Sequence, residues 1–125
     1  MAAWKGERIH AQAVLWTKQN LDDVTVSVSD LRNGSSVIPA SEISTHFVRY
    51  VMTDELNKDG KGGCGHRDNK AEWDSLLVAD VLDIISVRDI PACSTQPIWM
   101  KIRVPSDVNS GKYKGIMTDS GANFR

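Results

Sequence analysis

The sequence predicts an all-β domain built as an antiparallel β-sandwich, with one long glycine-rich loop. Several short segments alternate apolar and polar residues with a period of two, which is typical of strands that have one face in water. Turn residues separate these segments, and hardly any helical period lies between them. This arrangement favours antiparallel pairing over a parallel α/β sheet, in an immunoglobulin-like or similar sandwich.

The first half of the chain contains three predicted strands. In residues 9–17 apolar side chains recur at every second position, and residues 24–29 alternate valine with serine and threonine. Residues 43–52 are dense in β-branched and aromatic side chains, so we expect a long strand there. Residues 33–36, Asn-Gly-Ser-Ser, are typical of a turn, which we expect to continue as a loop through residue 41.

The second half is less regular. Residues 57–69 are rich in glycine and charge and predict a long loop. Residues 72–85 suit either a helical face or a turn followed by a strand, and we favour the second reading. Because Pro97 interrupts the chain, the next strand is predicted over residues 98–104, paired as a hairpin with residues 112–118.

Size and charge exclude several classes of function. The 125 residues suit one domain, residues 1–125, and the formal net charge of -1 gives no electrostatic reason to bind nucleic acid or anionic lipid. Residues 1–8 lack the apolar core of a signal peptide, and no stretch approaches a membrane span. Cys64 and Cys93 permit at most one disulfide and are too far apart for a CxxC redox pair.

Three groups of short stretches carry a resemblance to a known family. They are Gly-Glu-Arg at 6–8 with residues 11–15; residues 47–51, 62–67 and 77–80; and residues 96–99 with Val-Pro at 104–105 and Gly-Lys-Tyr-Lys-Gly at 111–115. In these stretches the chain resembles the N-terminal β-sandwich of glycoside hydrolase family 123 and its uncharacterised bacterial relatives.

The resemblance implies a non-catalytic accessory domain from a longer multidomain protein. The family's best-known members release β-N-acetylgalactosamine with an Asp-Glu pair and the substrate's own acetamido group. Those carboxylates belong to a following (β/α)8 barrel, which needs about 200 residues or more, and no position here matches them. The resemblance therefore implies that this domain supports the barrel, without a cofactor, in a protein that is secreted, periplasmic or at the cell surface. The alternative is an independent carbohydrate-binding module.

Chemistry within the long loop is disfavoured by geometry. Glycosidases need two carboxyl groups facing each other across a sugar, whereas Asp54 and Glu55 are adjacent and would point to opposite faces of a strand. Residues 57–68 resemble a calcium loop only weakly, because a lysine stands where an acidic ligand is needed. Cys64 and His66 lie two residues apart, with no evident fourth metal ligand and no assured orienting carboxylate for a nucleophile.

Contacts with another domain or a ligand remain the expected role of this region. A long charged loop in a small domain usually binds something or packs against a neighbour. Exposed tryptophans are candidates for stacking on sugar rings; Trp99, between Ile98 and Met100 in a strand, is instead expected in the core. The candidate contact residues are Arg49, Asp54, His66 and Arg67 near the loop, with Trp16 and Trp73 as the exposed tryptophans.

Overall fold

A computed structural model describes residues 1–53 and 76–120. The chain forms two compact units, one made of Met1–Phe47 with Leu82–Arg125 and the other of Val48–Val81. The described strands are β1 (Arg8–Thr17), β2 (Leu21–Val28), β3 (Leu31–Asn33), β4 (Ser36–Ile38), β5 (Ile43–Thr53), β6 (Leu76–Leu82), β7 (Val87–Ile90), β8 (Ser94–Arg103) and β9 (Met117–Asp119).

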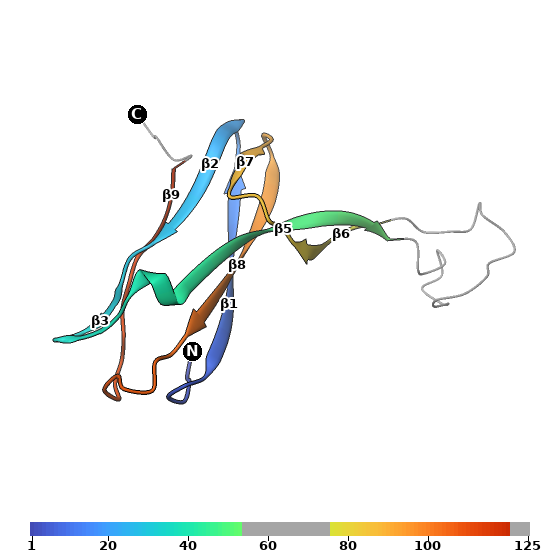
Figure 1. The fold of residues 1–125 in the computed structure, drawn as a ribbon. Coiled ribbons are helices and arrows are strands. Elements are labelled where there is room, and N and C mark those ends of the chain that lie inside the picture. The colour runs from blue at the N-terminus through green and yellow to red at the C-terminus, as the bar shows by residue number, and fades with distance from the viewer. Residues whose placement is uncertain (54–75, 121–125) are drawn as a thin grey trace, which may run out of the picture. The chain divides into compact units, whose positions relative to one another are not determined.

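In the first unit, β8 lies between β1 and the first half of β5, and both pairings are antiparallel (Figure 1). Ile9 pairs with Ile102, and Ala13 pairs with Ile98. Because paired residues share a face of the sheet, these apolar side chains lie together on its inner side. The burial of β1 alternates residue by residue, which confirms the predicted strand and its two faces.

The second sheet of this unit has the order β7-β2-β9, with β2 in the centre. Its outer positions on β2, such as Thr25, are exposed, while Val24 is fully buried. A separate hairpin joins β3 and β4 through the predicted turn, where Gly34 adopts a φ of 58°. Glycine suits this position because a left-handed backbone there strains other residues.

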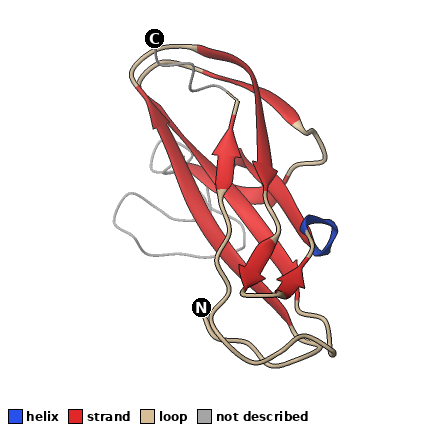
Figure 2. Ribbon diagram, turned by 90° about the vertical axis from the view of Figure 1, so that its left-hand side faces the viewer, coloured by secondary structure: helices blue, strands red, loops and turns tan. Residues whose placement is uncertain are grey.

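The core lies between the two sheets. Val24 of β2 and Ile90 of β7 meet Phe47 of β5 and Ile98 of β8, and Leu15, Leu21 and Val26 pack around this cluster. Contact between apolar faces of two antiparallel sheets is the arrangement of a β-sandwich, so the predicted fold class is confirmed. The ribbon is accordingly made almost entirely of strands and loops (Figure 2).

The second unit contains the end of β5 and most of β6, which are neighbours in their sheet. The strand predicted after a turn within residues 72–85 is therefore present as β6. The predicted loop over residues 57–69 lies outside the described residues. No helix among residues 1–53 and 76–120 is long and apolar enough to cross a membrane.

The predicted start of β8 was wrong. This strand begins at Ser94 and contains Pro97, which pairs with Val14. The register of β5 against β8 ends at Ile98, so Pro97 lies just past the part of β8 that has β5 beside it. A proline is tolerated where a strand has a free side, because its missing N–H then costs no ladder hydrogen bond.

The predicted hairpin between residues 98–104 and 112–118 was also wrong. β8 pairs with β1 and β5, whereas Lys114 forms a bridge with Arg32 and β9 pairs with β2. Sequence proximity favours hairpins, but here the chain crosses from one sheet to the other. The loop expected through residue 41 was wrong in part, because it contains β4 and ends in a 3-10 turn, η1 (Ala40–Glu42). The sequence did not predict β3, β4 or β7.

Candidate functional site

The predicted contact residues are only partly within the described chain. Asp54, His66, Arg67 and Trp73 lie outside it. Arg49 is exposed on the part of β5 that belongs to the second unit. Trp16 is 55% exposed on β1, in the first unit, as expected for a surface tryptophan.

Most residues of the possible metal and nucleophile sites lie outside the part of the chain that the structure describes. Glu55, the possible calcium loop over residues 57–68 and Cys64 all fall there. Cys93 is exposed with a free thiol. Within residues 1–53 and 76–120, no group of three or more histidine, cysteine, aspartate or glutamate side chains is placed to hold a metal ion.

The first unit presents an exposed apolar segment between β6 and β7. We call it the docking segment, and it consists of Leu82, Ile84, Ile85 and Val87. Ile84 is 98% exposed, and the other three side chains are each more than two fifths exposed. Several large apolar side chains exposed within one short segment are unfavourable in an isolated domain and commonly mark an interaction surface.

Asp83 fixes the backbone of the docking segment. Its N–H donates to the Phe47 carbonyl at 2.8 Å, and its own carbonyl lies 3.2 Å from Nδ1 of His46. Its carboxylate forms an ion pair with Arg88, and both side chains are largely buried. The guanidinium of Arg88 also lies 5.9 Å from the ring centre of Phe47. The segment is thus anchored to the core, and Ile84 is held outward by a defined turn.

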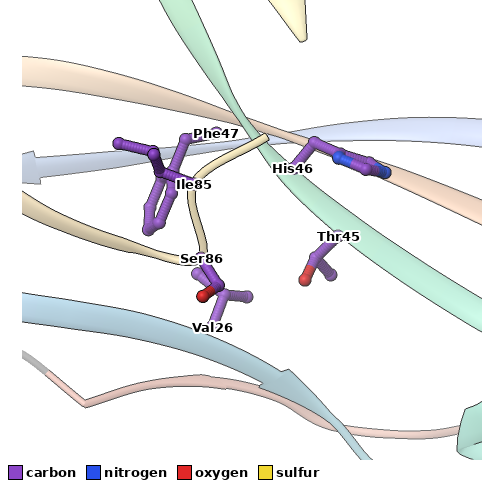
Figure 3. Close-up of a pocket in the computed structure, with 6 residues that line it drawn as sticks. All are labelled: Val26, Thr45, His46, Phe47, Ile85 and Ser86. Atoms are coloured by element: carbon purple, nitrogen blue, oxygen red, sulfur yellow. The ribbon is translucent and has the colours of Figure 1, made fainter. Parts of the chain in front are cut away.

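A small pocket lies beneath this segment (Figure 3). Val26, Thr45, His46, Phe47, Ile85 and Ser86 line it, with a volume of about 40 Å³. A water molecule needs about 10–15 Å³ on this measure, so the pocket has room for a few waters but not for a sugar.

A larger groove opens at the end of the sandwich near the N-terminus. Its volume is about 340 Å³, and the apolar residues that line it include Ile9 of β1, Ile38 of β4 and Ile102 of β8. Lys5 and Lys112 lie among its lining residues. The groove is within the size range of small-molecule sites.

The outer face of β1 and β8 carries aromatic side chains. Trp99 has Gln12 directly opposite and His10 diagonal to it, and the rings of His10 and Trp99 are 5.3 Å apart between centroids. The prediction that Trp99 belongs to the core was therefore wrong, because it is partly buried on the outer face. The signal was present in the sequence, since Trp99 is in phase with Lys101 and Arg103, which are exposed.

Arg103 forms the best-defined ion pair of this face. Its Nε lies 2.5 Å from one carboxylate oxygen of Glu42, and a second guanidinium nitrogen lies 2.8 Å from the other. The hydrogen bonds from Arg103 lower the pKa of Glu42. Arg103 is exposed and Glu42 is partly buried, and ion pairs with an exposed partner contribute little to stability.

The domain is thus a β-sandwich with aromatic side chains on the outer face of β1 and β8. It also has an exposed apolar segment, the docking segment. Residues 1–119 match the family described as "Glycoside hydrolase 123 N-terminal domain". The chain belongs to this family, as its sequence resemblance implied. A search of the curated proteins found no match.

Solved structures give a consistent result for the fold. One similar structure is that of a family 123 glycoside hydrolase from Clostridium perfringens, described in a study of glycolipid glycan hydrolysis. The TM-score is 0.80 at 18% sequence identity, and the match covers 98% of this chain. It covers 20% of that enzyme, so this chain spans about a fifth of the enzyme's length.

Proposed function

We propose that this chain is a non-catalytic N-terminal domain that packs against and supports the catalytic barrel of the same polypeptide, a glycosidase acting on β-N-acetylgalactosaminides. The observation that carries the proposal is the family match over residues 1–119, which identifies the N-terminal part of a glycoside hydrolase. The much greater length of the Clostridium perfringens enzyme supports a further domain in the parent protein.

The docking segment is the surface that we assign to this contact. Burying Ile84 alone would contribute about 1.5–3 kcal/mol relative to leaving it in water. The anchoring of Asp83 to Phe47 and Arg88 means that little ordering entropy is lost when a partner covers the segment. Charged residues at the edge, such as the exposed Asp89, give the polar rim usual for an interface.

Strand β2 places Val87 and Ser120 on its two sides. On one side Thr25 of β2 pairs with Val87, and on the other its N–H donates to Oγ of Ser120 at 2.8 Å. Two strand spacings separate Val87 from Ser120, which is about 10 Å.

A chromogenic β-N-acetylgalactosaminide assay tests the absence of catalysis in the domain. The 125-residue chain and its full-length parent are assayed side by side at equal concentration. We expect release of the chromophore by the parent alone. Release by the 125-residue chain at a comparable rate would overturn the proposal.

The docking assignment has its own test in the full-length parent. Ile84→Asp should lower the melting temperature of the parent, because it places a charge in the interdomain contact. Ile116→Asp is the matched control, since Ile116 is also well exposed but lies outside the docking segment. Equal effects of the two substitutions would contradict the assignment.

A further inference from the structure

The outer face of β1 and β8 carries a connected row of apolar and aromatic side chains. Trp99 has His10 and Val14 diagonal to it across the strand pair, and Val14 is followed on the same face by Trp16. We call this row, His10–Trp99–Val14–Trp16, the aromatic row. Val14 and Trp16 are both more than half exposed, which is unusual for large apolar side chains placed side by side on a sheet.

The geometry of this row suits extended ligands. Trp16 pairs with Thr95, four residues from Trp99 along β8, so the two tryptophans are about 14 Å apart between their Cα atoms. This separation is too long for one sugar ring to touch both indoles. An oligosaccharide lying along the strands could place separate rings on Trp16 and Trp99.

Charge on the face indicates which ligands it prefers. Neither β1 nor β8 contains an aspartate or a glutamate, although the whole chain has 16 acidic residues. Arg8 and Lys101 are exposed on the same face as the row, and Nζ of Lys18 lies 5.9 Å from the ring centre of Trp16. The aromatic rings are therefore bordered by cations, which complement a negatively charged ligand.

We propose that the aromatic row is a binding site for an acidic oligosaccharide, with sugar rings stacked on Trp16 and Trp99 and acidic groups paired with Lys101 and Arg8. The choice of a glycan rests on the proposed role within a glycosidase. The aromatic row and the docking segment share no residue, so glycan binding can be tested separately from docking. Single-stranded nucleic acid also stacks on aromatic rings near cations, but the net charge of -1 does not favour it.

Calorimetric titration of the 125-residue chain tests the proposal with three size-matched hexasaccharides. They are chondroitin sulfate with sulfate and carboxylate groups, hyaluronan with carboxylates only, and neutral chitohexaose. We expect at least one acidic ligand to bind about tenfold or more tightly than chitohexaose, and the comparison of the two acidic ligands identifies the preferred group. Equal affinity for chitohexaose, tighter binding of a single-stranded oligonucleotide, or no binding up to about 1 mM would overturn the proposal.

Matched variants separate stacking from simple charge attraction. Trp16→Ala and Trp99→Ala should each weaken acidic-glycan binding about tenfold, because each removes one stacked ring. Trp4→Ala should have no effect, since Trp4 is 84% exposed but precedes β1 and lies outside the row. Loss of affinity in Trp4→Ala equal to that in Trp16→Ala, or unchanged affinity in both row variants, would show that the row is not the site.

Two charge-reversal variants test the role of the cations. Lys101→Glu should abolish the preference for acidic ligands, whereas Lys112→Glu, which makes the same charge change near the end groove, should leave it intact. Equal losses from the two changes would assign the binding to overall charge and overturn the proposed site. Circular dichroism and melting temperatures of all variants ensure that each comparison is made on folded protein.

Discussion

The two isoleucines Ile84 and Ile90 allow a direct test of the fold and of the docking segment. Ile90 on β7 is 2% exposed and belongs to the core cluster, whereas Ile84 is 98% exposed. Ile90→Ala removes buried methyl and methylene groups and leaves a cavity, which costs about 3 kcal/mol for an isoleucine in a well-packed core. Ile84→Ala removes the same atoms from water and should change the free energy of unfolding by no more than about 0.5 kcal/mol.

Thermal and urea unfolding of the 125-residue chain measure this difference. A loss of about 3 kcal/mol in a domain of this size lowers the melting temperature by roughly 10 °C, while the Ile84 variant should melt within about 2 °C of the unmodified chain. The urea m-values should stay equal, because both variants expose the same chain on unfolding. A destabilisation by Ile84→Ala as large as that by Ile90→Ala would refute the outward placement of Ile84, and with it the docking segment.

Two further predictions concern polar contacts. Glu42→Gln removes the charged partner of Arg103. The pKa of Glu42 is lowered in the folded protein, so its ion pair stabilises the fold above the unfolded pKa of about 4.3. This stabilisation is lost as the pH falls through the folded pKa. The difference in melting temperature from the unmodified chain should therefore shrink between pH 6 and pH 3, and a constant difference would contradict this account. Tyr113→Phe removes a hydroxyl that donates to the Asn109 carbonyl at 2.8 Å and also lies 2.5 Å from Oγ of Ser36. The substitution should lower the free energy of unfolding, measured with denaturant, by about 1–2 kcal/mol. An unchanged free energy of unfolding would show that these hydrogen bonds do not stabilise the fold.

The long strands could be predicted from the sequence. β1 and β2 appear where the period of two predicted them, because each has one face on the core and one in water. β5 appears where the density of β-branched and aromatic residues predicted a long strand. β3, β4 and β7 were missed, since strands of three or four residues are too short to establish a period. β8 was shortened in the prediction because Pro97 is a strong local signal, and only the pairing partners show that it can be accommodated.

The candidate sites were predictable to a smaller extent. Trp16 was identified correctly as exposed, because it is out of phase with the apolar residues of its strand. Trp99 obeys the same rule, being in phase with Lys101, but its apolar neighbours Ile98 and Met100 suggested a core position. The docking segment could not be found from sequence, since the apolar residues Leu82, Ile84, Ile85 and Val87 are equally compatible with a buried strand. Its exposure depends on the contacts of Asp83, which join residues far apart in the chain.

The docking segment and the aromatic row can both be used in the same protein. The docking segment runs from Leu82, at the end of β6 in the four-stranded sheet, to Val87, which pairs with Thr25 in the sheet β7-β2-β9. The aromatic row lies on the outer face of β1 and β8, and β5 stands between β8 and β6 in the strand order. The two surfaces share no residue, so covering one need not cover the other. The substitutions distinguish them: Ile84→Asp should lower the melting temperature of the parent without affecting glycan binding, and Trp16→Ala should do the reverse. A fall in the parent's melting temperature with Trp16→Ala would instead identify the aromatic row as the contact with the catalytic domain.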